Sequence, residues 1–88
     1  MKFPFKQKNR GGLLIREFSA DVDSRELVWH RDRRDRKITV KNGSGWMIQF
    51  ENKLPQNLVE GQTYSIKKNV YHRIIRGNSG LILEIKEF

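Results

Sequence analysis

The chain has 88 residues, enough for one small domain with a single core. It contains no cysteine, which excludes disulfide bridges and thiolate metal sites, and its short apolar runs predict neither a transmembrane helix nor an export signal. Lys and Arg outnumber Asp and Glu by 18 to 10, and the net charge of +8 favours nucleic acid, lipid headgroups or small anions as partners. We expect a soluble, cytoplasmic protein that does not enter a membrane.

No segment repeats apolar residues at helical spacing over ten or more positions, so long amphipathic helices are not expected. Short stretches instead alternate apolar and polar residues, and turn residues interrupt them about every 8 to 12 positions, which is typical of antiparallel strands. Pro55 lies in a connection that cannot be a central strand. Strands are expected at 12–18, 25–32, 36–41, 45–52, 62–68, 70–77 and 81–88, with turns at 42–45 (NGSG) and 77–80 (GNSG).

This pattern predicts a single all-β domain over residues 1–88. About seven to eight short strands joined by hairpin-type turns indicate a small antiparallel barrel or sandwich. Residues 1–11 precede the first expected strand and are predicted to form a flexible or edge-strand arm.

Both histidines fall on predicted strands, His30 in RELVWHRD and His72 in VYHRIIRG. Residues two apart share one face of a strand, so Asp32 projects with His30, and both histidine faces carry apolar neighbours typical of a barrel interior. Two imidazoles and a carboxylate that converge there form a metal-binding triad open to water or substrate. The alternative is that each histidine is a half-buried polar residue satisfied by a neighbour, with Asp32 paired to Arg34 or Arg73.

The stretch VWHRDRRDRK, residues 28–37, has three interpretations: a nucleic-acid-binding run, a solvated loop, or a strand whose alternate side chains bind a ligand. We interpret 28–32 as the end of a strand and 33–37 as a solvated crossing to the next strand. The positive residues are dispersed along the chain rather than gathered on one helical face, so nucleic-acid binding is kept as an alternative and not favoured.

Residues 60–77, EGQTYSIKKNVYHRIIRG, resemble the second conserved motif of the cupin superfamily. Gly61 and His72 match that motif in register. Three positions depart from it, with residues of other types where the family has Pro, Gly and Asn: Lys67, Asn69 and Arg76.

The first cupin motif, laid on this chain, places His30 at its first histidine and Gly43 at its terminal glycine. Asp32 takes the position of the second histidine, and a carboxylate oxygen can replace it as a metal ligand. Arg36 takes the position of the family's glutamate, and a guanidinium cannot ligate a metal. If Arg36 points inward it favours an anion, and if it points to solvent the site has three protein ligands at most.

The resemblance covers roughly residues 12–88 and implies a jelly-roll barrel with a pocket lined by the two motifs. Cupins with the full ligand set hold one divalent metal, Fe, Mn, Ni or Zn, and support dioxygenase, isomerase or decarboxylase chemistry. A weaker likeness is to small cupin-like proteins of tailed phages. The candidate catalytic or metal-binding residues are His30, Asp32 and His72, and the candidate ligand contacts are Arg36, Gln49, Tyr64 and Arg73.

Three classes of function follow. The first is a cupin that binds a small, anionic ligand in its barrel, with or without a metal. The second is a metal-dependent enzyme of the oxygenase or isomerase type that uses the same site. The third is a basic accessory protein that binds nucleic acid or a protein partner, with the barrel as scaffold. A homodimer formed through edge strands is also expected, because a barrel of this size has edges to cover.

Overall fold

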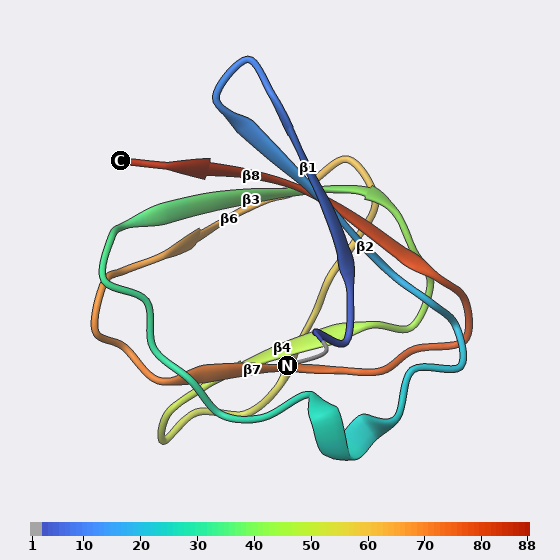
Figure 1. Ribbon diagram of the computed structural model, residues 1–88. Helices are drawn as coiled ribbons and strands as arrows, with labels where there is room; N and C mark the ends of the chain where they lie inside the picture. The colour runs from blue at the N-terminus through green and yellow to red at the C-terminus, as the bar shows by residue number, and fades with distance from the viewer. Residues whose placement is uncertain (1–2) are drawn as a thin grey trace.

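The computed structural model describes residues 3–88, and the predicted all-β antiparallel fold is confirmed (Figure 1). A five-stranded sheet has the order β1-β2-β8-β3-β6, and a three-stranded sheet has the order β5-β4-β7. No helix in the described part of the chain is long and apolar enough to cross a membrane. The strands are β1 (Lys6–Arg10), β2 (Leu13–Phe18), β3 (Arg36–Asn42), β4 (Met47–Phe50), β5 (Gln56–Asn57), β6 (Thr63–Ile66), β7 (His72–Ile75) and β8 (Leu81–Glu87).

Strand β8 lies at the centre of the larger sheet, and one of its faces forms part of the core between the two sheets. It pairs with β2 on one side and β3 on the other. Leu81, Leu83 and Ile85 alternate along it and are buried, as the period-two pattern predicts. Figure 1 shows this sheet on one side of the molecule, with β4 and β7 facing it from the other.

Residues 6–10, expected as part of a flexible or edge-strand arm, form the edge strand β1. The register places Gln7 opposite Arg16 of β2. All five side chains of β1 are exposed, and two lysines and an arginine among them disfavour pairing of this edge with another chain. Residues 1 and 2 of the predicted arm lie outside the described residues.

The strand predicted at 25–32 is wrong. Ser24–Glu26 form a short 3-10 helix, η1, whose N-terminal cap is Asp23; the Asp23 carboxylate accepts a hydrogen bond from the Arg25 amide at 2.9 Å. The chain then runs extended without a continuous ladder and makes a single antiparallel bridge, at His30. Of the apolar residues of this stretch, Leu27 packs against the core, whereas Val28 is 60% exposed and Trp29 is 42% exposed.

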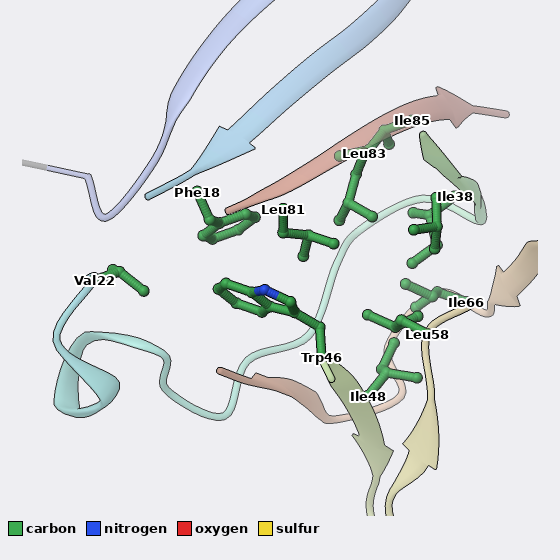
Figure 2. Close-up of a cluster of buried hydrophobic side chains, with 11 residues drawn as sticks. Phe18, Val22, Ile38, Trp46, Ile48, Leu58, Ile66, Leu81, Leu83 and Ile85 are labelled. Atoms are coloured by element: carbon green, nitrogen blue, oxygen red, sulfur yellow. The ribbon is translucent and has the colours of Figure 1, made fainter. Parts of the chain in front are cut away.

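The core lies between the two sheets and is centred on Trp46, which is fully buried (Figure 2). The Trp46 ring packs against Phe18 with the ring centroids 5.6 Å apart. Its indole Nε1 donates a hydrogen bond to the Ser79 carbonyl at 2.7 Å. That bond ties the residue that precedes β4 to the turn before β8, so Trp46 links the two sheets as well as filling the space between them.

The two predicted turns, 42–45 and 77–80, are present and lie against each other. The Asn78 amide donates to the Ser44 carbonyl at 2.9 Å, and the Ser44 amide donates to the Ser79 hydroxyl at 2.9 Å. A Cβ on Gly77 would lie 2.2 Å from the Ser44 carbonyl oxygen, so only glycine permits this approach. This end of the domain is therefore closed by turn-to-turn packing.

Candidate functional site

Two similar triplets, Trp-His-Arg at 29–31 and Tyr-His-Arg at 71–73, meet in the antiparallel bridge between the η1 connection and β7. His30 and His72 exchange both backbone hydrogen bonds, at 3.0 and 2.9 Å. Directly opposed residues in such a pair project to the same face, and the two imidazole centroids are 4.3 Å apart. His72 is buried, with 3% of its side chain exposed, while His30 is half-exposed.

Asp32 joins the two histidines because it lies two residues beyond His30 on the same face. Its Oδ2 is 3.4 Å from Nε2 of His72, and its Oδ1 is 4.0 Å from Nε2 of His30. The Asp32 carbonyl accepts a hydrogen bond from the Asn69 amide at 2.8 Å, which anchors the backbone here. Asn69 adopts a left-handed conformation, φ 65°, at a position where the cupin motif has glycine.

Hydrogen bonding sets the tautomers of both imidazoles. Nδ1 of His30 lies 3.0 Å from the Val28 carbonyl, and Nδ1 of His72 lies 2.9 Å from the Val70 carbonyl. A carbonyl oxygen only accepts, so each Nδ1 donates, and in its neutral form each ring presents an unprotonated Nε2 to Asp32. Burial lowers the pKa of His72, which favours its neutral form.

The Asp32 carboxylate faces the Nε2 atoms of two imidazoles, and Nη1 of Arg36 lies 3.3 Å from its Oδ1. Its Oδ2 is buried and has no hydrogen-bond partner among residues 3–88. A buried carboxylate oxygen that faces an unprotonated imidazole nitrogen is unfavourable unless a cation or a proton lies between the two atoms. The unsatisfied Oδ2 and the two Nε2 atoms thus point to a missing positive charge.

The residues fit a divalent metal ion. One ligand atom from each of His30, Asp32 and His72 can be chosen so that all three lie within 4.8 Å of one another. Metal–ligand bonds of about 2.0–2.2 Å at tetrahedral angles place two ligand atoms about 3.4 Å apart. Nε2 of His72 and Oδ2 of Asp32 are separated by 3.4 Å. Two imidazoles and one carboxylate are the donor set of the facial triad, and both Nδ1 atoms are held by carbonyls as outer-shell partners.

Several proteins of known structure superpose on nearly the whole of this chain. No protein-family model and no curated protein matches the sequence. A cupin-2 domain protein of Shewanella frigidimarina superposes with a TM-score of 0.69 at 21% identity, covering 100% of this chain and 83% of that one. A Neisseria meningitidis protein gives 0.66 at 21% identity, covering 100% and 86%. HppE, solved with Fe(II), gives 0.71 at 15% identity, covering 96% of this chain and 48% of that one.

This chain has the cupin fold. The resemblance noted from the two sequence motifs is therefore confirmed at the level of the fold. The chain spans about half of HppE, 48% and 55% in two of its structures, and that protein has been solved with its substrate as well as with Fe(II).

Arg36, at the position where cupins carry glutamate, points inward. Its Nη1 lies 3.3 Å from Asp32 Oδ1, while Nη2 and Nε lie 2.7 and 2.8 Å from Glu87 Oε2. Arg36 therefore does not ligate; it holds one oxygen of Asp32 and leaves the other facing His72. Because Glu87 compensates the guanidinium charge, Arg36 does not by itself prevent a cation from binding beside Asp32.

The cupin barrel contains a cavity of about 350 Å³ that opens from this cluster. Its walls are mainly isoleucine and leucine side chains from both sheets. Residues of the N-terminal arm, Phe3, Pro4 and Phe5, also line it, as do the exposed Glu26 of η1 and the guanidinium of Arg16. The cavity thus joins one polar end to an apolar body, which is typical of small-molecule sites.

The other predicted ligand contacts lie elsewhere. Arg73 donates to the Gln49 side chain at 2.9 Å, and its guanidinium lies over Trp29, 5.0 Å from the ring centroid. The Tyr64 hydroxyl accepts a hydrogen bond from the Val59 amide at 2.9 Å. Gln49, Tyr64 and Arg73 do not line the cavity, whereas Arg36 does.

Two residues of the candidate site, Arg16 and Glu87, were not predicted from the sequence. Arg16 lies between Leu14 and Phe18 on the face of β2 that packs on the core, and it pairs with buried Leu83. Glu87 falls on the same face of β8 as Leu83 and Ile85, at the exposed end of the strand. In both cases the sequence does contain an indication, because a charged residue falls on the core-facing side of a predicted strand.

Proposed function

We propose that this chain is a small cupin that binds one divalent ion, Fe, Mn, Ni or Zn, through His30, Asp32 and His72 and takes a small anionic molecule in its cavity. The observation that carries the proposal is the buried Asp32 Oδ2, which has no hydrogen-bond partner in the described part of the chain and faces the unprotonated Nε2 of His72. The Fe(II) form of HppE, a protein of the same fold, supports it.

A bound ion would supply Lewis-acid chemistry at the polar end of the cavity. The chain's own residues would do the rest: the two imidazoles bind through Nε2, Arg36 orients Asp32, and the apolar walls exclude water from a bound molecule. If the chain is an enzyme, the reaction is of the oxygenase or isomerase type at this same site.

Metal content is the direct test of this proposal. Protein purified without a histidine tag, stripped with chelator and reconstituted with each of the four ions in turn, is expected to retain about one equivalent of at least one of them. The measurement is elemental analysis after gel filtration. Retention below about a tenth of an equivalent for every ion, in protein shown by NMR to be folded, would reject the metal site.

Nucleic acid is a second candidate ligand, favoured by the outward face of the two triplets. Trp29 and Tyr71 are exposed there, and Arg73 and Arg31 lie over their rings at 5.0 and 5.4 Å. Exposed aromatic rings interleaved with arginines are the elements that bind single-stranded nucleic acid, by stacking and by phosphate contacts.

If this surface binds a fluorescein-labelled single-stranded oligonucleotide, affinity is expected to fall steeply between about 50 and 200 mM salt as counterions are released. Fluorescence anisotropy measures it. Trp29→Ala is expected to weaken binding about fivefold or more through lost stacking, while Lys8→Gln on β1, away from the triplets, changes it little. Absent binding at low salt, or equal effects of the two substitutions, would exclude the surface.

The homodimer and the cytoplasmic location stay predictions. Residues 1–88 are proposed to form one cupin-like domain, and the open edges that support dimerisation are those of β6 and β5, since the charges on β1 disfavour pairing there.

A further inference from the structure

The cavity contains an arginine, Arg16, that forms no ion pair with any residue from 3 to 88. Among the described residues, the one hydrogen-bond acceptor of the Arg16 guanidinium is the Gln7 side chain, 2.8 Å from Nε. The flat face of the group lies over the Phe5 ring, 3.9 Å from its centroid. Gln7 and Phe5 thus fix the orientation of the guanidinium. Its two Nη atoms form a fork that has no acceptor among the described residues.

The position of Arg16 makes this charge unfavourable in the absence of a ligand. Burial, together with the nearby charge of Arg36, lowers the pKa of Arg16 to about 10. The carboxylates of Asp32 and Glu87 act in the opposite direction but are already engaged with Arg36. Arg16 still carries its proton at neutral pH, so an anion that entered the cavity would stabilise it.

The rest of the cavity sets the kind of anion. Beyond the polar end, the walls are aliphatic, from Ile38, Ile48, Ile66 and Leu83, and Phe5 and Phe3 of the arm also line the cavity. A volume of about 350 Å³ holds about ten water-sized groups, which suits a molecule of that many heavy atoms. A dianionic phosphate would lose more hydration against such walls than a carboxylate does.

We propose that the cavity takes an amphiphilic monocarboxylate whose carboxylate is bound by the Nη fork of Arg16 and whose apolar body lies against the isoleucine and leucine walls. The inference rests on the proposed cavity ligand and names its chemical class and the residue that recognises it. Arg16 is a binding residue here, separate from the residues His30, Asp32 and His72 that would hold the ion.

Octanoate and its neutral analogue octanamide are suitable probes because they differ only in the head group. In an NMR titration of the full chain, octanoate is expected to bind at least about tenfold more tightly than octanamide, since a charge-assisted fork contributes about 1.5–3 kcal/mol. The Arg16 Nε–H resonance is expected to shift with octanoate alone. Arg16→Gln should bring octanoate to the affinity of octanamide, while Arg10→Gln, an exposed arginine on β1, should leave the tenfold preference unchanged.

Arg16→Lys is a second variant in case Arg16→Gln does not fold. It keeps the charge and loses the fork, so it should retain only part of the preference, a factor of about three. Every titration is run on metal-loaded and on chelated protein, which separates this inference from the metal proposal. A preference that survives chelation and disappears in Arg16→Gln supports Arg16 even if no metal binds. Equal binding of the two probes, no binding of either, or a preference lost on chelation but kept in Arg16→Gln would overturn the assignment.

Discussion

Replacing Asp32 with asparagine is expected to weaken the binding of a divalent ion by at least about a hundredfold. Loss of an outer-shell partner alone typically lowers metal affinity 10- to 100-fold, and this change removes the only anionic ligand of the triad. The asparagine amide also supplies the N–H donor that the cluster lacks, and it can satisfy Nε2 of His72 without an ion. Isothermal titration with the best-retained ion measures the affinity.

Glu51→Gln is the matched control, since it removes one carboxylate of similar chemistry from an exposed turn after β4. Its affinity for the ion is expected to equal that of the unsubstituted chain. His72→Ala should lose binding to a similar extent as Asp32→Asn, because it removes the buried imidazole ligand. An Asp32→Asn variant that binds the ion as tightly as the Glu51→Gln control would contradict the proposed triad.

Replacing Trp46 with alanine is expected to lower the free energy of unfolding by about 4 kcal/mol. Removal of a large, fully buried aromatic side chain leaves a cavity and typically destabilises a domain by about 3–5 kcal/mol. Trp46 also loses its bond to Ser79, which leaves that carbonyl without its indole donor. Since the free energy of unfolding of a small domain is only about 5–15 kcal/mol, this loss is a large fraction of it. Urea unfolding followed by circular dichroism measures the loss.

The chain provides its own control, because it has one other tryptophan. Trp29 is 42% exposed and contacts the guanidinium of Arg73, so Trp29→Ala should cost at most about 1 kcal/mol. Similar losses for the two substitutions would mean that the core is not organised around Trp46.

The strands could be predicted from alternation because side chains in a half-buried strand must point inward at every second position. Leu81, Leu83 and Ile85 follow this rule, as do Ile38 and Val40 of β3. The same rule failed at 25–32. Leu27, Val28 and Trp29 look like strand residues, but the chain there meets β7 at a single bridge, and Asp23 stabilises a short 3-10 helix instead.

The candidate site could be predicted in its residues but not in its arrangement. His30 and Asp32 share a face through their spacing alone, and the resemblance to the cupin motifs brought His72 to them. Arg36 was left open between pocket and solvent, because its direction depends on Glu87 at the far end of the chain. Arg16 was not predicted, because its role depends on the cavity that the two sheets enclose, and the sequence pattern does not show that cavity.

An all-β domain, the positions of its turns and the ligand types available at His30, Asp32 and His72 could all be predicted from the sequence. These features follow from local periodicity and residue chemistry, which need no knowledge of distant neighbours. Only the tertiary structure decided that the two histidines form a directly opposed pair, that Arg36 orients Asp32, and that Arg16 faces an apolar cavity. Those relations depend on which strands pair and in which register, and long-range packing of the whole chain selects that pairing.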